Sequence, residues 1–369
     1  MEECLDAALP GVPMKSVFAI LCFVLCLAPS AHAWNAEGHM VGTQIAYNHL
    51  TPSVKAQCDA LIATPVVYAS SINNTFVTAS VWADDLKSST NAWNNWHFIN
   101  IPFSLDGTPT NGFVPGAFDV VQAIRTNIYY LQHPATTQSN RAFHLRLLLH
   151  FVTDMQQPLH CTTAMSAATP NGDAGGNGFG LTGGWGNLHF LWDSGGNNLT
   201  NSLPRPLSVA SQNLLSNKAA AIEALFPYDY AANIGTVADP MTWAAEGVGL
   251  AQTVCYANIT RNTTPSSTYL NNAATTTNQR MAVSGQRLAD LLNTILGTNT
   301  VTLTAVMHTN NNFKFSWYGL LGRNYQVQWK QSLTDPTWNN LTNIVPTANQ
   351  SVSFTESLNQ ARRFYRVVQ

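Results

Sequence analysis

The chain has 369 residues, of which 45% are apolar and only 10% are charged. Because about a quarter of the residues in a soluble domain are usually charged, Asn, Thr, Ser and Gln must supply most of the polar surface. The formal net charge of −2 excludes a protein that attracts nucleic acid through a positive field over its whole surface. A polyanionic ligand would need local cations, and bound metal ions are the obvious source.

The chain begins with a pattern typical of a secretory signal peptide. A lysine follows Met14, an apolar stretch covers residues 17–28, and Ala31-His32-Ala33 forms a small-x-small cleavage site. We expect translation to start at Met14 and cleavage to remove residues 1–33, leaving Trp34 as the first residue of a secreted or periplasmic protein. The apolar stretch is too short to span a bilayer as a helix. The cleavage site argues against the alternative, an uncleaved anchor, so we expect no stable membrane association.

Three cysteines, Cys58, Cys161 and Cys255, lie beyond the predicted cleavage site. An odd number allows at most one disulfide and leaves one thiol over. None of the three has the spacing of a metal site relative to another cysteine.

Residues 34–297 are expected to form one mainly helical domain, because apolar residues recur along them with helical spacing. Helices are predicted over residues 38–50, 118–132, 141–157, 207–226 and 278–296, with another one starting at Thr51-Pro52. Pro158 should end the helix before it, and the glycine-rich residues 171–186 must form a loop.

The character of the chain changes after residue 297. Apolar and polar residues alternate over residues 301–304, 313–317, 325–329, 351–354 and 364–367. Such segments, separated by Asn, Gly and Pro, predict a small β-sandwich over residues 298–369. Since this region holds no cluster of histidines or acids, we expect an accessory or attachment module rather than a second catalytic domain.

Five histidines of the helical domain have settings that suggest metal binding: His39, His97, His150, His160 and His189. Two of them precede an aspartate by four residues, giving the pairs His150–Asp154 and His189–Asp193. On a helix this spacing puts an imidazole and a carboxylate on one face, which makes half of a zinc site.

The alternative for each pair is a structural role. A single buried histidine is usually satisfied by hydrogen bonds. Asp154, in an otherwise apolar helix, could pair with Arg141 or Arg146 instead of a metal. Two such pairs together with three further histidines favour metal, and they indicate a secreted hydrolase with several metal ions.

Longer motifs extend this pattern. They are Trp34-Asn35-Ala36-Glu37-Gly38-His39, Val81-Trp82-Ala83-Asp84, Trp96-His97-Phe98-Ile99, residues 148–160 with both His150 and His160, Gly175-Gly176-Asn177, residues 187–193 with His189, and Arg287-Leu288-Ala289. On these motifs the chain resembles the three-zinc phospholipase C and single-strand nuclease superfamily, and most closely its S1/P1 nuclease type, from Trp34 to about Leu296. The resemblance implies a multi-helix domain of the phospholipase C/nuclease type ahead of the sandwich.

The resemblance further implies three zinc ions. Their ligands would be Asp84, His97, His150 and Asp154 for the first, the α-amino group and carbonyl oxygen of Trp34 with His39 and Asp154 for the second, and His160, His189 and Asp193 for the third. Asp154 would therefore bridge two ions. Because Trp34 offers an α-amino group only after cleavage, the predicted leader and the predicted site support each other.

The activity implied by the resemblance is hydrolysis of single-stranded DNA and RNA to 5′-phosphorylated products, with removal of phosphate from 3′-mononucleotides. A water shared by the bridged ions would attack phosphorus as hydroxide, and the third ion would stabilise the departing 3′-oxygen. Asp154 is thus the central catalytic position. The protein is expected to act as a monomer.

Substrate contacts are expected at Phe98 and Asn100 and, in a glycine-rich loop, at Asp173, Asn177 and Phe179. Phe98 matches a position that stacks a nucleobase in the family, and stacking suits single strands because duplex bases already stack on each other. The alternative for Phe98 is an ordinary core aromatic residue, and the alternative for the loop is a solvated turn.

One pair of positions departs from the family pattern. The family often has an arginine or lysine near Asp84 that pairs with an aspartate near His97. Lys87 fills the first place, but Asn100 stands in the second. Lys87 is expected either to touch a phosphate without a carboxylate partner to aim it, or to be a solvated surface lysine.

Two other functions remain open. A phospholipase C that releases a phosphorylated head group would use the same zinc site. A non-catalytic zinc-containing protein could instead bind a ligand through its sandwich. Phe98 and residues 175–177 favour the nuclease over the first, and the nine suitable ligand positions argue against the second.

Overall fold

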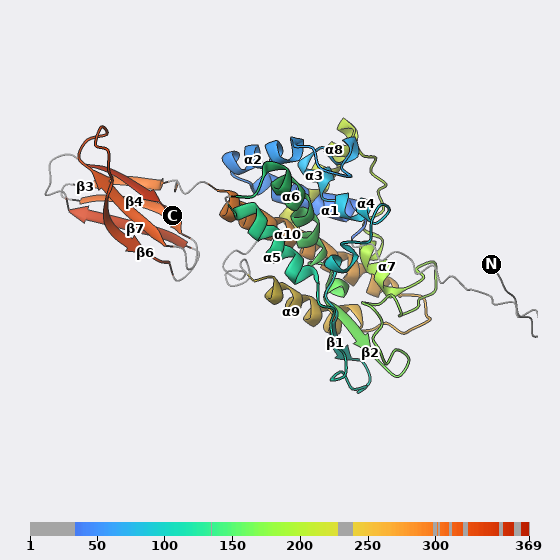
Figure 1. Cartoon of the computed structure of the whole chain (residues 1–369). Coiled ribbons are helices and arrows are strands. Elements are labelled where there is room, and N and C mark those ends of the chain that lie inside the picture. Colours follow the sequence, from blue (N-terminus) through green and yellow to red (C-terminus); the bar gives the residue numbers. More distant parts are fainter. Residues whose placement is uncertain are drawn as a thin grey trace, which may run out of the picture. The chain divides into compact units, whose positions relative to one another are not determined.

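The computed structural model describes residues 34–133, 135–227, 239–297, 301, 303–309, 312–319, 324–346, 350–357 and 363–368. The predicted leader and its cleavage site lie outside these residues. Helices make up the first part of the described chain and strands the last part (Figure 1), and each part is considered by itself. None of the helices in the described ranges is long and apolar enough to cross a membrane.

Helices dominate the described part of residues 34–297, which confirms the mainly α class. They are α1 (Ala36–His49), α2 (Pro52–Ala63), α3 (Phe76–Ala79), α4 (Trp82–Leu86), α5 (Val120–Gln132), α6 (Gln138–Asp154), α7 (Leu188–Asp193), α8 (Val209–Leu225), α9 (Pro240–Leu250) and α10 (Ser267–Leu296). The side chains of Asn35, Thr51 and Asp119 accept a backbone N–H from the first turn of α1, α2 and α5. These caps explain where the three helices begin.

The short helices α3 and α4 were not predicted, and three longer helices also differ from the prediction. Helix α6 ends at Asp154 instead of residue 157, because the residue four places on is Pro158, which has no N–H to donate to the Asp154 carbonyl. Helix α10 begins at Ser267 instead of residue 278; Ser266 caps it, and its polar first turns carry no apolar periodicity. Helix α9 was not predicted, although Asp239 caps its first turn.

Helix α6 is the central helix of this part of the chain. Every residue from Leu145 to Asp154 is buried, as expected for a helix that is covered on all sides. Helices α1, α2, α4, α5 and α10 pack against it. The last turns of α6 therefore bring His150 and Asp154 into the protein interior.

A short parallel pair of strands, which the sequence did not predict, joins two distant segments. Strand β1 (Ile101–Ser104) pairs with β2 (Thr162–Met165), with Ile101 opposite Thr162. Just before the strands, the Ile99 N–H donates to the His160 carbonyl at 2.8 Å, and the Val120 N–H donates to the Phe98 carbonyl at 3.1 Å. These bonds hold the segment around His97 beside His160.

The last part of the chain forms the predicted β-sandwich. Its strands are β3 (Leu303–Thr309), β4 (Asn312–Gly319), β5 (Tyr325–Lys330), β6 (Asn339–Ile344), β7 (Gln350–Ser357) and β8 (Phe364–Val368). They form two antiparallel sheets with the orders β3-β4-β7 and β6-β5-β8. Phe315 and Trp317 of one sheet share a core with Tyr325, Val327 and Val367 of the other. Strand β6 was missed because its asparagine-rich sequence has low β-propensity.

Cys58, Cys161 and Cys255 are buried free thiols, so the one disulfide that three cysteines would allow is not formed.

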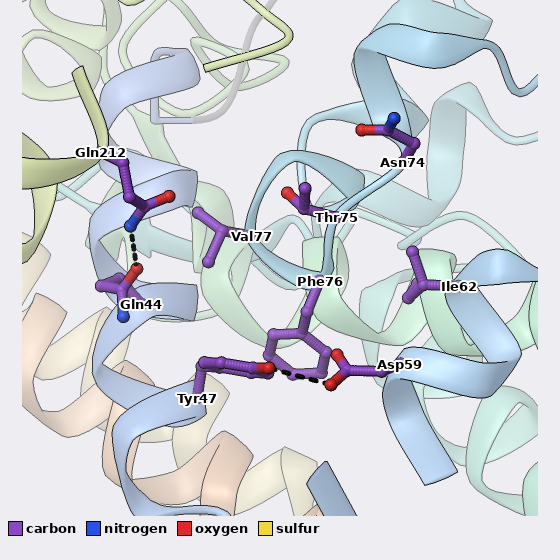
Figure 2. A pocket seen from close by; sticks show the side chains of 9 residues that line it. All are labelled: Gln44, Tyr47, Asp59, Ile62, Asn74, Thr75, Phe76, Val77 and Gln212. Atoms are coloured by element: carbon purple, nitrogen blue, oxygen red, sulfur yellow. Dashed lines mark hydrogen bonds between the residues drawn. The ribbon is translucent and has the colours of Figure 1, made fainter. Parts of the chain in front are cut away.

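A cavity of about 360 Å³ lies among α1, α2, α3 and α8 (Figure 2). Tyr47 packs against Phe76 and donates a hydrogen bond of 2.9 Å to Asp59, and Gln212 donates one of 2.7 Å to Gln44. None of the residues that line this cavity is a predicted ligand or substrate contact. The candidate site is therefore a different region.

Candidate metal centre

Asp154, the last residue of α6, has imidazoles on both sides of its carboxylate. Its Oδ2 lies 3.0 Å from Nδ1 of His97 and 3.1 Å from Nε2 of His150, while its Oδ1 lies 3.4 Å from Nε2 of His39. All four side chains are buried. One carboxylate thus faces two separate sets of imidazole nitrogens.

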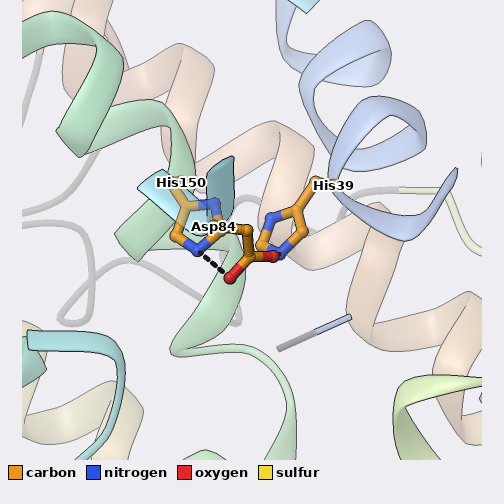
Figure 3. Close-up of side chains that lie close together, drawn as sticks. All are labelled: His39, Asp84 and His150. Carbon is orange, nitrogen blue, oxygen red and sulfur yellow. Dashed lines mark ion pairs between the residues drawn. The ribbon is translucent and has the colours of Figure 1, made fainter. Parts of the chain in front are cut away.

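Asp84, on α4, faces the same imidazoles. Its carboxylate oxygens lie 3.7 Å from Nε2 of His150, 3.8 Å from Nε2 of His39 and 3.9 Å from Nδ1 of His97. Figure 3 shows this carboxylate close to the rings of His39 and His150, which stack with their centroids 4.0 Å apart. The ligand atoms of His39, Asp84 and His150 lie within 4.8 Å of one another, and so do those of His97, His150 and Asp154.

A second group consists of His160, His189 and Asp193, with ligand atoms again within 4.8 Å of one another. Nε2 of His189 lies 3.3 Å from Oδ2 of Asp193, and Nε2 of His160 lies 4.0 Å from Oδ1. His189 and Asp193 share one face of α7, as their spacing predicted. The amide of Gln157 donates to Asp193 Oδ1 at 2.8 Å and so orients this carboxylate.

Backbone carbonyls orient three of the imidazoles. Nδ1 of His150, His160 and His189 donates to the carbonyl oxygens of Ser80, His97 and Gly175 at 2.6, 2.7 and 2.7 Å. A carbonyl oxygen can only accept, so Nδ1 carries the proton and Nε2 keeps its lone pair. In each case Nε2 is the nitrogen that faces a carboxylate, which is the tautomer a metal ligand needs.

Thr153 orients the fourth imidazole and also contacts Trp34. Nδ1 of His39 donates to the Thr153 hydroxyl at 2.6 Å, and this hydroxyl donates to the His150 carbonyl at 2.7 Å. The buried indole of Trp34 donates from Nε1 to the Thr153 carbonyl at 3.1 Å. The first described residue is therefore held beside the end of α6, next to Asp154.

Burial controls the protonation of the imidazoles. It lowers the pKa of His39 to about 3 and the pKa values of His97 and His150 to about 4, and it holds the pKa of His160 well below its usual value. These rings are therefore neutral near pH 7, which is the form that binds a metal cation.

The carboxylates respond to burial in different ways. Burial raises the pKa of Asp154 and raises that of Asp193 well above its usual value. Burial also acts to raise the pKa of Asp84, but His150, Lys87 and the other nearby imidazoles outweigh it and hold this pKa well below the usual range. The charged forms of Asp154 and Asp193 are therefore unfavourable in the buried interior unless nearby cations compensate their charge.

Several buried polar atoms of the site lack a hydrogen-bond partner among the described residues, and a bound cation would take that partner's place. His39 Nε2, His160 Nε2 and Asp154 Oδ1 are buried and accept or donate no hydrogen bond within the described part of the chain. Each such atom costs about 1–3 kcal/mol when it is left without a partner. Imidazole nitrogen and carboxylate oxygen are donors that zinc takes in proteins. The residues present therefore fit metal ions.

The expectation that Lys87 lacks a carboxylate partner was wrong. Its ammonium group donates to Asp84 Oδ1 at 2.7 Å. The family pattern predicts a carboxylate partner for Lys87 near His97, where this chain has Asn100. The side chain of Lys87 instead folds back by one helical turn and reaches Asp84. Asn100 is half-buried directly before β1.

The predicted substrate contacts divide into two kinds. Phe98 and Asn177 are half-buried, and the Asn177 amide donates to a carbonyl of its own loop at 2.9 Å. Asp173 and Phe179 are buried. Asp173 accepts a backbone N–H at 2.9 Å and the Tyr256 hydroxyl at 2.6 Å, and the ring of Phe179 meets that of Tyr256 edge to face. These last two residues hold the glycine-rich loop in place.

Several supporting residues were not singled out from the sequence. They include Thr153 and Gln157, described above, and a buried network in which Arg287 donates to both oxygens of Glu246 at 2.8 Å and to Gln156 at 3.1 Å. Apart from Glu246, all of them lie within the motifs already quoted. For Thr153, Gln156 and Gln157 the available signal was their place between the predicted ligands His150 and His160.

Known proteins resemble this chain over most of its length. The family model described as S1/P1 nuclease matches residues 34–297. Endonuclease 2 of Arabidopsis thaliana is 26% identical over 301 residues, which cover 75% of this chain and 96% of the plant protein. Nuclease PA3 of a Penicillium species is 26% identical over 72% of this chain and 98% of its own, and nuclease P1 of Penicillium citrinum is 28% identical over 44% and 57%. Among solved structures, the alpha toxin from Clostridium absonum aligns with 89% of this chain and 83% of its own, at 13% identity and a TM-score of 0.36. Because the family model matches most of the chain, the protein belongs to the S1/P1 nuclease family.

Proposed function

We propose that this nuclease is a secreted, zinc-dependent phosphodiesterase that cuts single-stranded DNA and RNA to 5′-phosphorylated products and removes phosphate from 3′-mononucleotides. Family membership supports the nuclease activity itself. The observation that carries the finer proposal is Asp154, whose two oxygens face different imidazoles inside the core. A carboxylate in that position is suited to bridge two cations.

The proposal includes three zinc ions. Their ligands are Asp84, His97, His150 and Asp154; then the Trp34 α-amino group and carbonyl oxygen with His39 and Asp154; then His160, His189 and Asp193. The compact group of His160, His189 and Asp193 supports the third set. His39 lies near Asp84 as well as near Asp154, so its place in the second set depends on Trp34.

Zinc bound at such a site lowers the pKa of water and offsets charge on phosphoryl oxygens. The chain supplies orientation and substrate contacts. Lys87, whose ammonium group donates to Asp84, would contact a phosphate. Phe98 would stack a base, and Asn100 and Asn177 would donate or accept hydrogen bonds at its edge. Asp173 and Phe179 would act on the substrate by holding the loop.

We also propose the processing and organisation expected from the sequence. A leader over residues 1–33 would be removed, residues 34–297 would form the three-zinc domain, and residues 298–369 would form the accessory domain. The mature protein would be a monomer outside the cytoplasm without stable attachment to a membrane. Mass spectrometry of the secreted protein would test the cleavage position, since an N-terminus other than Trp34 contradicts it.

The central experiment is turnover by the mature chain loaded with zinc. Single-stranded DNA, a 3′-mononucleotide and a phosphocholine ester are offered separately, each with and without chelator. We expect chelator-sensitive cleavage of the DNA to 5′-phosphorylated products and release of phosphate from the nucleotide. Turnover of the choline ester alone would instead assign the phospholipase reaction, and no turnover of any phosphoester would support a non-catalytic binding protein.

The role of Trp34 has its own test. One alanine added before Trp34 moves the α-amino group by a residue while keeping every side chain. We expect this variant to bind one zinc ion fewer and to lose most of its activity. An added alanine after residue 369 is the matched control. Full zinc content and activity in the first variant would exclude the α-amino group as a ligand.

A further inference from the structure

The sandwich and the helical domain have opposite charge. From Val301 to Gln369 the chain carries six lysine and arginine residues against two acidic ones, a formal charge of +4. Residues 34–297 carry ten basic against fourteen acidic residues, a formal charge of −4. The small overall charge of the chain therefore hides a basic module, and an excess of positive charge suits a module that binds an anion.

Cations and tryptophans gather where β5 ends and β8 begins. The guanidinium carbon of Arg366 lies 4.4 Å from the ring centroid of Trp338, and Lys330 Nζ lies 4.7 Å from the same centroid. The guanidinium carbon of Arg363 lies 4.0 Å from the ring centroid of Trp329. We call Arg366, Lys330 and Trp338 the basic–aromatic cluster. Trp329 pairs directly with the core residue Tyr365, so Trp329 and the Arg363 beside it lie on the other face of the sheet.

Arg366 points away from the sandwich core. Its neighbours Tyr365 and Val367 belong to the core, so alternation along β8 directs Arg366 outward. It is exposed, and its Nε donates to Gln328, on the strand beside it, at 2.8 Å. Lys330 is buried instead, and its ammonium group binds the carbonyls of Leu333 and Asp335. The exposed charge of the cluster is therefore mainly that of Arg366.

The two acids of the sandwich do not neutralise Arg366. Glu356 pairs with Arg363 and accepts the Tyr365 hydroxyl at 2.6 Å. The Asp335 carboxylate accepts the backbone N–H groups of residues 331 and 332. Arg366 thus keeps an exposed positive charge beside an indole and an amide.

We propose that the basic–aromatic cluster binds the phosphates and bases of a single-stranded nucleic acid, so that the sandwich holds the substrate strand for the helical domain. The proposal rests on the function proposed above. A guanidinium binds phosphate, and exposed bases stack on aromatic rings and on guanidinium planes. Because the sandwich is covalently joined to the helical domain, a strand held by one is at high local concentration for the other. A neutral polysaccharide could use the aromatic rings but would gain nothing from the excess positive charge.

Binding is tested on the full mature chain in excess chelator, where the strand is not cut. Affinity for fluorescent dT20 is measured over a range of salt concentrations for the unaltered chain and for Arg366→Gln. Each phosphate contact on a single strand contributes about 0.7 to the slope of log affinity against log salt. We expect Arg366→Gln to reduce this slope by about 0.7 and to weaken binding several-fold at low salt.

The matched control is Lys314→Gln. Lys314 is exposed on the other sheet, where it lies between the core residues Phe313 and Phe315 and so points outward. This variant has the same change in charge, and we expect an unaltered slope. Arg366→Lys, which keeps the charge, should keep the slope while losing part of the affinity. Thermal unfolding of all three variants checks that they fold.

The results separate the two proposals. Equal effects of Arg366→Gln and Lys314→Gln, or no effect of either, would overturn the cluster as a strand-binding site. Binding of uncharged dextran as tight as that of dT20 would also overturn it and assign a carbohydrate instead. Hydrolysis of a dinucleotide by the zinc-loaded unaltered chain is measured in parallel, because failure there contradicts the proposed function and not the cluster.

Discussion

The two groups of side chains that could hold metal ions differ in the surroundings of their carboxylates. Asp154 stands between imidazoles of α1, of the segment around His97 and of its own helix α6, and each of its oxygens faces a different set. Among the described residues Asp193 faces the imidazoles of His160 and His189, and an amide from Gln157 holds one of its oxygens. A shared carboxylate makes a compact site but links two metal positions to one residue. A separately supported carboxylate lets its metal position be gained or lost alone.

The strongest test of this comparison is Asp154→Asn. An amide oxygen is a poor bridge between cations, so we expect the loss of two of the three zinc ions and a fall in turnover of at least about a thousandfold. Zinc content by mass spectrometry and turnover of single-stranded DNA measure both effects. Loss of one ion only would contradict the bridging role.

The control for Asp154→Asn is its stability without metal. Burial raises the pKa of Asp154, so the charged carboxylate is unfavourable in the metal-free interior. A neutral amide removes that penalty. In chelator we expect the urea midpoint of the variant to equal or exceed that of the unaltered chain. A lower midpoint would mean that Asp154 mainly stabilises the fold.

Asp193→Asn should have the next largest effect. Because Asp193 serves one group, we expect the loss of one zinc ion while two remain. Turnover should fall by about a hundredfold or more if the third ion stabilises charge in the transition state. Zinc content again decides the outcome, since loss of two ions would mean that the two groups are not independent.

Gln157→Leu should have a smaller effect, because it removes the hydrogen bonds to Asp193 and to the Leu159 N–H but none of the proposed ligands. Loss of such a supporting contact typically weakens metal affinity about 10- to 100-fold. We expect a change of this size for one zinc ion only, measured by competition with a chelating dye. Gln122→Leu, on the exposed face of α5, is the matched control. Equal affinities for all ions in both variants would show that Gln157 does not support Asp193.

The smallest effect concerns a histidine outside both groups. Burial lowers the pKa of His144 to about 4, and Asn127 lies 2.7 Å from its Nδ1. Well above the pKa of about 6.5 that the ring has in the unfolded chain, His144 is neutral in both the folded and the unfolded chain. Between pH 6.5 and pH 4 only the unfolded chain takes up the proton, so the free energy of unfolding falls as the pH falls.

His144→Gln should remove this part of the pH dependence. Because His144 is partly exposed, we expect a change of less than about 1 kcal/mol between pH 7 and pH 5. Urea unfolding of both chains with zinc bound measures it. An unchanged pH dependence would mean that His144 does not contribute to the acid sensitivity of the fold.

The sequence predicted what depends on neighbouring residues along one element. That each of the pairs His150–Asp154 and His189–Asp193 shares one face of a helix could be predicted, because four residues make about one helical turn. The strands of the sandwich could be predicted because their apolar and polar side chains alternate with period two. The resemblance to the family implied nine ligand positions. The structure brings the side chains of eight of them together in two groups, and their role as zinc ligands stays a prediction.

Contacts between segments far apart in the sequence could not be predicted from the sequence. Thr153 anchors His39 across 114 residues, and the His97 carbonyl orients His160 across 63. No periodicity reports such contacts, because they depend on how helices pack and on the register of β1 and β2. The ion pair between Lys87 and Asp84 could not be predicted either, although the two residues are close in sequence, because it depends on the Lys87 side chain folding back along α4.

The pairing of β1 with β2 has a consequence for divergence within the family. The Val120–Phe98 hydrogen bond and the strand pair hold both ends of residues 105–119, and Val114 and Phe118 of this loop are 85% and 62% exposed. Doubling the length of a loop whose ends are already held raises its closure free energy by only about 0.6 kcal/mol. Relatives can therefore lengthen, shorten or rewrite this stretch at little thermodynamic cost. Such changes would leave His97 and His160 where they are, because the strand pair and its flanking hydrogen bonds hold these two residues beside each other.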